Sequence, residues 1–253
     1  MLAHRVIPTL LLQDGGLVKT CRFGNPKYVG DPINAIRIFN DKEVDELIVI
    51  DITASRNKRE PDYGLIEEFA GECFMPLAYG GGIRTVEQAA RILSLGVEKI
   101  CVQSAALEGT NLVRELADRF GSQSVVVSVD VKRNWRSRPQ LYRSKDRHCM
   151  REGWTEFAQR MVREGAGEIL LNAVDRDGTL SGPDYDLIRT AARCLTVPLV
   201  ALGGVSSLKE IKLAVEAGAS AVAAGAFFVF HGPHRAVLIT YPRYRELETL
   251  FHR

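Results

Sequence analysis

Long apolar runs, paired cysteines and an excess of one charge are all missing from this sequence. No stretch is long and apolar enough to span a bilayer, and no signal-peptide pattern opens the chain. The five cysteines are scattered without CxxC spacing, which argues against a disulfide framework and favours a reducing cytoplasm. The net charge is only +2 with both signs interspersed, so composition indicates neither nucleic-acid nor membrane binding.

Two ligand-binding signatures are absent as well. His4, His148, His231, His234 and His252 show no metal-ligand spacing backed by nearby acids or cysteines, so we expect no metal and no other cofactor. No GxGxxG motif follows the first strand-like segment, which disfavours an open doubly wound sheet. The 253 residues, 46% apolar and 25% charged, are enough for one large α/β domain with a sizeable core.

Short β-rich segments alternate with amphipathic helical segments along the whole chain. Residues 85–96 and 207–218 show apolar side chains at helical spacing, and each segment ends at a glycine. Such alternation predicts a parallel sheet, and eight strands predict a closed (β/α)8 barrel, here one domain over residues 1–253. The first strand is expected to feed a loop at Asp14. The eight segments are 5–13, 46–51, 75–81, 99–106, 124–130, 168–174, 198–204 and 220–227.

The two halves of the chain resemble each other. Residues 75–100 align without gaps on residues 197–222, at an offset of 203 − 81 = 122. A repeat of half the chain length predicts two half-barrels, at about 1–122 and 123–253, each with its own version of any site.

Glycines at the strand ends are the first candidate site residues. Gly203 and Gly204, with Ala224 and Gly225, fit the phosphate cradle that the last two loops of such a barrel usually form. The repeat supplies a second candidate cradle on the other half, made of Gly81, Gly82, Gln103 and Ser104. Two cradles across one barrel mouth predict a substrate with a phosphate at each end. The alternative is that these glycines only make tight turns.

Three aspartates end strands or follow them closely. Asp130 is followed by Lys132 and Arg133 rather than by a helix start, which favours catalysis over helix capping. For Asp51 the two interpretations remain equally open. Asp177 lies in the loop after the sixth strand.

The following segments occur in order along nearly the whole chain: MLAHRVIP, KYVGDPINA, DELIVIDITAS, YGGGIR, FGSQSVVVSVDVKR, GAGEILLNAVDRDGT, and LGG followed by AAGAFF. Together they resemble the HisF family, the cyclase subunit of imidazole glycerol phosphate synthase. The resemblance implies a barrel that takes ammonia from a glutaminase subunit at its N-terminal face. It also implies closure of a bis-phosphorylated ribulosyl aminoimidazole carboxamide to imidazole glycerol phosphate and AICAR, in histidine biosynthesis.

The chain departs from this family at one catalytic position. Catalytic aspartates end strands 1 and 5 in the family; Asp130 matches the second, whereas the first falls on Leu11. Leucine cannot transfer a proton, and general acid–base groups contribute about 10²- to 10⁴-fold to rates. The family's loop lysine is kept as Lys19, and the sixth-strand loop keeps Asp177 with Gly178. Leu202 and Gln103 stand where the family usually has serine and asparagine.

Charged residues at the opposite end of the barrel match the family's ammonia gate. They are Arg5, Glu46, Lys99 and Glu168, at the starts of strands 1, 2, 4 and 6. Two cations and two anions can neutralise each other while leaving a narrow polar passage. The alternative is a charge layer that merely closes the barrel.

A chain with this gate and without one catalytic acid resembles the second-copy HisF-like proteins associated with sugar amidation in surface-polysaccharide (LPS O-antigen) biosynthesis. The resemblance implies a HisH-like glutaminase partner and ammonia delivery to a sugar amidotransferase. One alternative is a working cyclase in which Asp177 or Asp51 compensates for Leu11. Another is a scaffold that only stimulates its glutaminase.

Residues 132–151 are basic and include Trp135 and Tyr142. We interpret them as a solvated hairpin, as in the family, rather than as a nucleic-acid patch. A docking surface for the amidotransferase is a further alternative.

Overall fold

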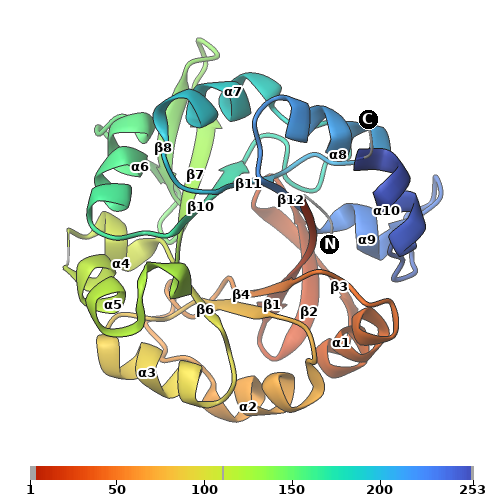
Figure 1. The fold of residues 1–253 in the computed structure, drawn as a ribbon, viewed down its shortest axis with the longest axis horizontal. Coiled ribbons are helices and arrows are strands. Elements are labelled where there is room, and N and C mark those ends of the chain that lie inside the picture. Colours follow the sequence, from red (N-terminus) through yellow and green to blue (C-terminus); the bar gives the residue numbers. More distant parts are fainter. Residues whose placement is uncertain (1–3, 110, 252–253) are drawn as a thin grey trace.

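Eight parallel strands close into a ring, and helices surround it (Figure 1). The computed structural model describes residues 4–109 and 111–251, so the predicted domain boundaries at residues 1 and 253 lie outside the described residues. Each barrel strand pairs in parallel with the next, and the last pairs with the first, which confirms the predicted (β/α)8 barrel. The barrel strands are β1 (Arg5–Gln13), β4 (Leu47–Asp51), β5 (Leu77–Gly80), β6 (Lys99–Val102), β7 (Val125–Arg133), β10 (Glu168–Ala173), β11 (Leu199–Leu202) and β12 (Ala221–Ala224).

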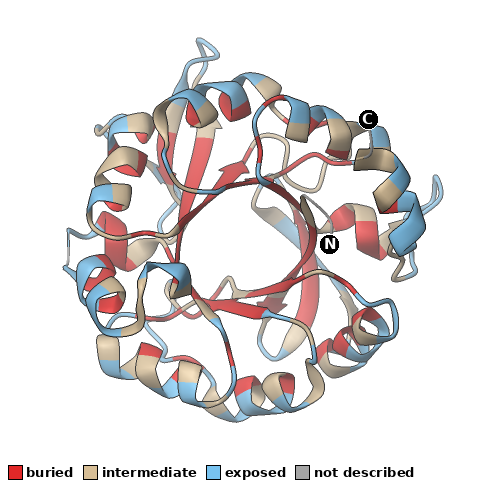
Figure 2. Ribbon diagram, viewed as in Figure 1, coloured by how far each residue is buried: buried red, intermediate tan, exposed pale blue. Residues whose placement is uncertain are grey.

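The outer helices bury one face against the strands and expose the other to solvent (Figure 2). Helix α3 shows how the sequence sets these ends: Thr85 and Gln88 form a capping box, and Gly96, at φ +105°, follows the last turn. No helix among the described residues is long and apolar enough to cross a membrane. The helices are α1 (Pro32–Asp41), α2 (Tyr63–Glu72), α3 (Val86–Ser94), α5 (Leu112–Phe120), α6 (Trp154–Arg163), α7 (Tyr185–Cys194), α8 (Leu208–Glu216) and α10 (Tyr244–Phe251), with the shorter α4 (Ser104–Leu107), α9 (Ala226–Val229) and 3-10 turn η1 (Ser122–Ser124).

The segment after the first strand is a hairpin, and the prediction of a loop there was wrong. Strand β2 (Gly16–Cys21) folds back antiparallel on β1 and pairs with β3 (Gly24–Gly30). Asp14 and Gly15, at φ +50° and +80°, provide the tight turn that such a hairpin requires. The expected hairpin after β7 is present as β8 (Pro139–Arg143) and β9 (His148–Cys149), and a small hairpin joins β13 (Phe230–His231) to β14 (Ala236–Val237).

Side chains of the barrel strands alternate between the barrel interior and the layer under the helices. On β1, Leu10 and Leu12 belong to the outer core, whereas Ile7 belongs to an interior cluster. Because side chains alternate along a strand, Leu11 points inward with Ile7. The interior cluster consists of Ile7, Ile48, Ala78, Cys101, Val126, Leu170, Val200, Ala221 and Ala223.

Contacts recur at the offset of 122 residues. The N–H of Leu47 donates to the carbonyl of Pro76 at 2.9 Å, and the N–H of Ile169 donates to that of Pro198 at 3.0 Å. These contacts support the two half-barrels, whose boundaries stay a prediction.

Candidate functional site

A cavity opens where the barrel strands end, at their carboxyl side. Most residues predicted for catalysis or phosphate binding meet there, although they come from distant parts of the sequence. Those that line the cavity are Leu11, Lys19, Asp51, Gly81, Gln103, Ser104, Asp130, Asp177, Gly178 and Gly225.

Asp130 lies on β7 at the inner part of this cavity and is only 4% exposed. Burial raises the pKa of its carboxyl group to about 7, although hydrogen bonds from Ser128 and Gln103 act to lower it. The Ser128 hydroxyl donates to Asp130 Oδ1 at 3.0 Å. A carboxyl group that titrates near neutral pH can both donate and accept a proton, which suits general acid–base catalysis.

Leu11 contributes an apolar wall to the same cavity. Its neighbours Leu10 and Leu12 are buried under the helices and do not reach the cavity. Of the three consecutive leucines, one therefore lies at the site and two belong to the core.

Buried Lys19 and half-buried Asp177 form an ionisable pair in the cavity. The Lys19 ammonium, on β2, donates to the carbonyl of Thr9. Burial lowers the pKa of Lys19 to about 8, while the charge of Asp177 opposes that change. Burial also raises the pKa of Asp177, whose Oδ2 accepts from the Thr20 hydroxyl at 2.9 Å. The β2–β3 hairpin, missed in the sequence, thus carries the lysine to this aspartate.

Closely packed neighbours explain why two positions of the site are glycine. A Cβ on Gly178, which has φ +66°, would overlap the carbonyl oxygen of Thr20. A Cβ on Gly225 would lie 2.6 Å from Lys19 Nζ, so the missing side chain makes room for the ammonium group. Gly178 holds the loop after β10 against β2, and Gly225 keeps Lys19 facing inward.

The two predicted phosphate cradles differ in their surroundings. In the first, Gly81 lies at the cavity, but the N–H of Gly82 donates to the Ser55 hydroxyl at 3.2 Å. The second cradle lines a smaller adjoining pocket, with Gly203, Gly204, Ala224 and Gly225. Gly81 packs tightly against Asp51, and Gly203 packs tightly against Ala173. Both positions would therefore require glycine whether these residues bind phosphate or only make tight turns. Phosphate binding stays a prediction.

Asp51 uses one carboxylate oxygen to cap the loop that follows β4. Its Oδ1 accepts from the N–H and hydroxyl of Thr53, both at 2.8 Å, and from the N–H of Ala54 at 2.9 Å. Arg59 lies 3.8 Å from the other oxygen. These partners favour the capping interpretation and argue against Asp51 as a replacement for the missing acid.

Three polar residues that the sequence analysis did not single out also line the cavity: Thr9, Ser128 and Asn172. Each is two residues after a member of the interior apolar cluster, namely Ile7, Val126 and Leu170. Strand alternation could have found them once the register of the strands was known.

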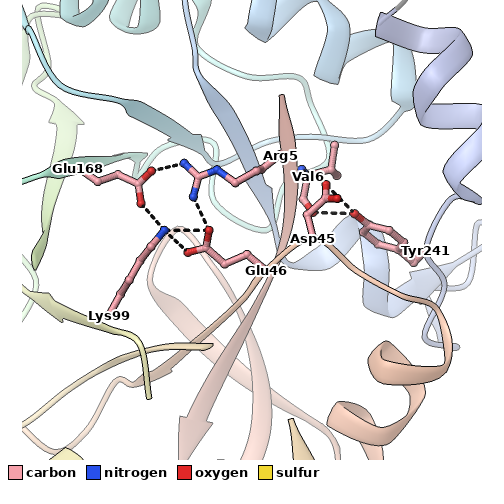
Figure 3. Close-up of polar contacts among 7 residues, drawn as sticks. All are labelled: Arg5, Val6, Asp45, Glu46, Lys99, Glu168 and Tyr241. Atoms are coloured by element: carbon pink, nitrogen blue, oxygen red, sulfur yellow. Dashed lines mark hydrogen bonds and ion pairs between the residues drawn. The ribbon is translucent and has the colours of Figure 1, made fainter. Parts of the chain in front are cut away.

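At the opposite end of the barrel, the four predicted gate residues form one connected ring (Figure 3). Arg5 bridges Glu46 and Glu168 through separate guanidinium nitrogens. Lys99 Nζ completes the ring, at 2.8 Å from Glu46 Oε1 and 3.1 Å from Glu168 Oε2. Both carboxylates are buried, and each is paired with two cations. Such pairing offsets the cost of burying four charges.

A second polar cluster lies next to this ring (Figure 3). Asp45 Oδ2 accepts from the N–H of Val6 at 2.9 Å, and the Tyr241 hydroxyl donates to the carbonyl of Val6 at 2.8 Å. Burial raises the pKa of Asp45. Because Val6 and Asp45 adjoin Arg5 and Glu46 in the chain, these bonds position the two ring residues.

The basic hairpin offers little stacking surface for nucleic acid. Trp135 is 84% exposed and carries the Arg136 guanidinium over its ring, but Tyr142 is 3% exposed and packs near Phe23. Among residues 4–109 and 111–251, no group of three or more histidine, cysteine or acidic residues could hold a metal ion.

Comparison with known proteins agrees with this geometry. Residues 5–233 match the family model described as histidine biosynthesis protein. A Pseudomonas aeruginosa protein, provisionally named imidazole glycerol phosphate synthase subunit hisF2, is 53% identical over 98% of this chain and 99% of its own. A Leptospira interrogans protein, provisionally named subunit HisF, is 48% identical over the full length of both chains. A Vibrio vulnificus protein, provisionally named subunit hisF3, is 48% identical over 96% of this chain and 94% of its own.

Proposed function

Because the chain belongs to the HisF-like family of imidazole glycerol phosphate synthase subunits, we propose that it is the synthase subunit of a glutamine amidotransferase complex. A HisH-like glutaminase docks at the N-terminal barrel face as a heterodimer and releases ammonia into the barrel. The ammonia leaves at the cavity and reaches a sugar amidotransferase. The final acceptor is an N-acetyl sugar of surface-polysaccharide biosynthesis.

The observation that carries this proposal is the contrast between the two barrel ends. The complete ring of Arg5, Glu46, Lys99 and Glu168 lies at one end, while Leu11 lines the cavity at the other. A reaction that closes a ring usually needs two groups with opposed proton-transfer roles. A chain with one such group and an intact entrance is suited to ammonia delivery more than to cyclisation.

The barrel interior supports passage of neutral ammonia. The ring contains two cations and two anions, so it carries no net charge. Beyond it lies the interior apolar cluster, which would exclude ammonium because a charge is costly to bury in apolar surroundings. The smallest members of the cluster are Ala78, Ala221 and Ala223, and they leave the most room near the axis.

The first experiment tests cyclisation directly. The purified chain is mixed with the bis-phosphorylated ribulosyl aminoimidazole carboxamide and excess ammonium salt at alkaline pH, which bypasses any glutaminase, and substrate loss is followed. We expect no turnover by the natural chain and recovery with Leu11→Asp. The double variant Leu11→Asp with Asp130→Asn is the matched control and should be inactive again. Turnover by the natural chain at the rate of an ordinary cyclase would overturn the proposed loss of cyclisation.

A second experiment tests delivery. The chain, its glutaminase and the sugar amidotransferase are combined, and amidation is measured with glutamine or with ammonium salt as the nitrogen source. We expect the chain to be needed with glutamine and dispensable with ammonium. If glutamine consumption rises but amidation does not, the chain is a scaffold that only stimulates glutaminase.

One observation favours a second candidate function, an authentic cyclase of histidine biosynthesis that binds the phosphorylated substrate at the cradles. The Asp130 carboxyl has a pKa of about 7, and half-buried Asp177 lies with Lys19 in the same cavity. In that case Asp177 would supply the second proton-transfer group, and Asp177→Asn would abolish turnover.

A further inference from the structure

Inward-facing side chains on two of the barrel strands follow the same order along the barrel axis. On β1 they read Arg5, Ile7 and Thr9, and on β10 they read Glu168, Leu170 and Asn172. Each of these two strands thus presents a charged residue, then an apolar one, then a polar one. Because inward residues are spaced by two positions, this order runs from the N-terminal face to the cavity.

The polar layer lies between the apolar cluster and the mouth of the cavity. It consists of Thr9, Ser128 and Asn172, all buried and all lining the cavity. Asn172 pairs in register with Asp130 on the neighbouring strand β7, and Ser128 donates its hydroxyl hydrogen to Asp130. These three side chains therefore follow the apolar cluster toward the mouth on strands β1, β7 and β10.

Two oxygens of the layer lack hydrogen-bond partners. Among the described residues, Thr9 Oγ1 and Asn172 Oδ1 are the buried side-chain oxygen or nitrogen atoms without one. Thr9 is 2% exposed and Asn172 is 8% exposed, so bulk solvent satisfies neither. A buried polar atom without a partner is costly, and a native structure that keeps two on one cavity points to a ligand with hydrogen-bond donors.

The surroundings restrict the charge of that ligand. The Lys19 ammonium donates to the backbone carbonyl of Thr9, so a cation already lies at the floor of the cavity. A second cation beside it would be repelled. A neutral molecule with N–H donors fits, since it can donate to Thr9 Oγ1 and to Asn172 Oδ1 while its lone pair stays free for a later acceptor.

We propose that Thr9, Ser128 and Asn172 form a receiving site for neutral ammonia at the inner end of the cavity. The site holds ammonia after it leaves the apolar cluster and before an acceptor takes it. Ammonia donates to Thr9 Oγ1 and Asn172 Oδ1, and Ser128 keeps the Asp130 carboxyl oriented beside it. This inference rests on the proposed function, because it takes ammonia to be what the barrel conducts.

The test uses the chain alone, so that it does not depend on the glutaminase or on the acceptor. The protein is labelled with ¹³C at the aspartate carboxyls, and the Asp130 signal is assigned by its loss in Asp130→Asn. Ammonium chloride is titrated at alkaline pH, with potassium chloride at equal ionic strength as the reference. We expect a saturable shift of the Asp130 signal with ammonium and none with potassium.

Variants decide whether the polar layer is responsible. Thr9→Val keeps the shape of the side chain and removes the hydroxyl, whereas Thr9→Ser keeps the hydroxyl. We expect the apparent dissociation constant for ammonia to rise roughly three- to tenfold in Thr9→Val and to stay unchanged in Thr9→Ser. Asn172→Leu should weaken binding similarly, and it serves as a second variant if Thr9→Val does not fold.

The inference is overturned if the natural chain shows no ammonium-specific shift, or if folded Thr9→Val and Asn172→Leu bind ammonia as tightly as the natural chain. Failure of amidation in the reconstituted complex, with this shift intact, would instead count against the proposed function alone.

Discussion

Asp130→Asn should make the protein more stable, and the gain should depend on pH. In the folded chain, burial raises the pKa of the Asp130 carboxyl from 3.8 to about 7. Between these values the folded state binds more protons than the unfolded state, so stability falls as pH rises through this window. Asparagine has nearly the same shape and carries no charge at any of these pH values, so it removes this loss.

The size of the gain follows from the shift. One pKa unit corresponds to about 1.4 kcal/mol, so a rise from 3.8 to about 7 corresponds to about 4 kcal/mol once Asp130 is fully ionised, near pH 8. At pH 5 the folded carboxyl is still protonated, and the difference is roughly 2 kcal/mol. Below about pH 4 both states are protonated and the pH-dependent gain disappears. Asparagine keeps one acceptor oxygen for Ser128, but its amide nitrogen cannot accept from Gln103, which subtracts about 1 kcal/mol at every pH.

Urea unfolding of both proteins at pH 5 and pH 8 measures the effect. The gain in the free energy of unfolding of Asp130→Asn over the natural chain should be about 2 kcal/mol larger at pH 8 than at pH 5. Asp146→Asn is the matched control, because Arg143 lowers the pKa of Asp146 and the substitution should give no gain at pH 8. An equal effect of Asp130→Asn at both pH values would refute the argument that this carboxyl is destabilised by burial.

Two further predictions concern packing and charge. Lys99→Met removes one of the two cations of the ring and should lower the free energy of unfolding by about 3 kcal/mol. The control Arg37→Met breaks an exposed ion pair and should leave the free energy of unfolding unchanged in the same urea assay. Gly178→Ala should lower the free energy of unfolding by about 3 kcal/mol, because the new Cβ would overlap a backbone carbonyl and the residue has a positive φ. The control Gly15→Ala also has a positive φ but open space around it, and should lower the free energy of unfolding by about 1 kcal/mol. Equal losses within either pair of variants would contradict the contacts described.

The barrel could be predicted from the sequence because its signals are local. Alternation of strands and helices, and glycines such as Gly96 after a helix, need only neighbouring residues. The β1–β2 hairpin was missed although Asp14-Gly15 is a strong hairpin signal, because the first strand was expected to feed a loop there. Lys19 belongs to that hairpin, so its burial and its contact with Thr9 could not be anticipated.

The site was predicted unevenly, for a physical reason. Leu11 and Asp130 could be placed at the cavity because both end barrel strands, and strand ends meet at one face. The polar layer requires the relative register of strands, which no local pattern fixes. The contact of Tyr241 with Val6 joins residues that are 235 positions apart in the sequence, so it too becomes visible only in the fold.

The two barrel ends respond differently to a single substitution. At the cavity, an aspartate in place of Leu11 would add a second carboxylate near Asp130, which already titrates near neutral pH because it is buried. Two carboxylates at close range destabilise each other's ionised forms. Leucine at position 11 therefore stabilises the fold, but it cannot transfer a proton. In the ring, loss of Lys99 would leave Glu46 and Glu168 buried with Arg5 alone. A single substitution in the charged ring therefore lowers the stability of the fold. Leucine in place of aspartate at position 11 raises it. A barrel with an intact ring and Leu11 follows from that asymmetry.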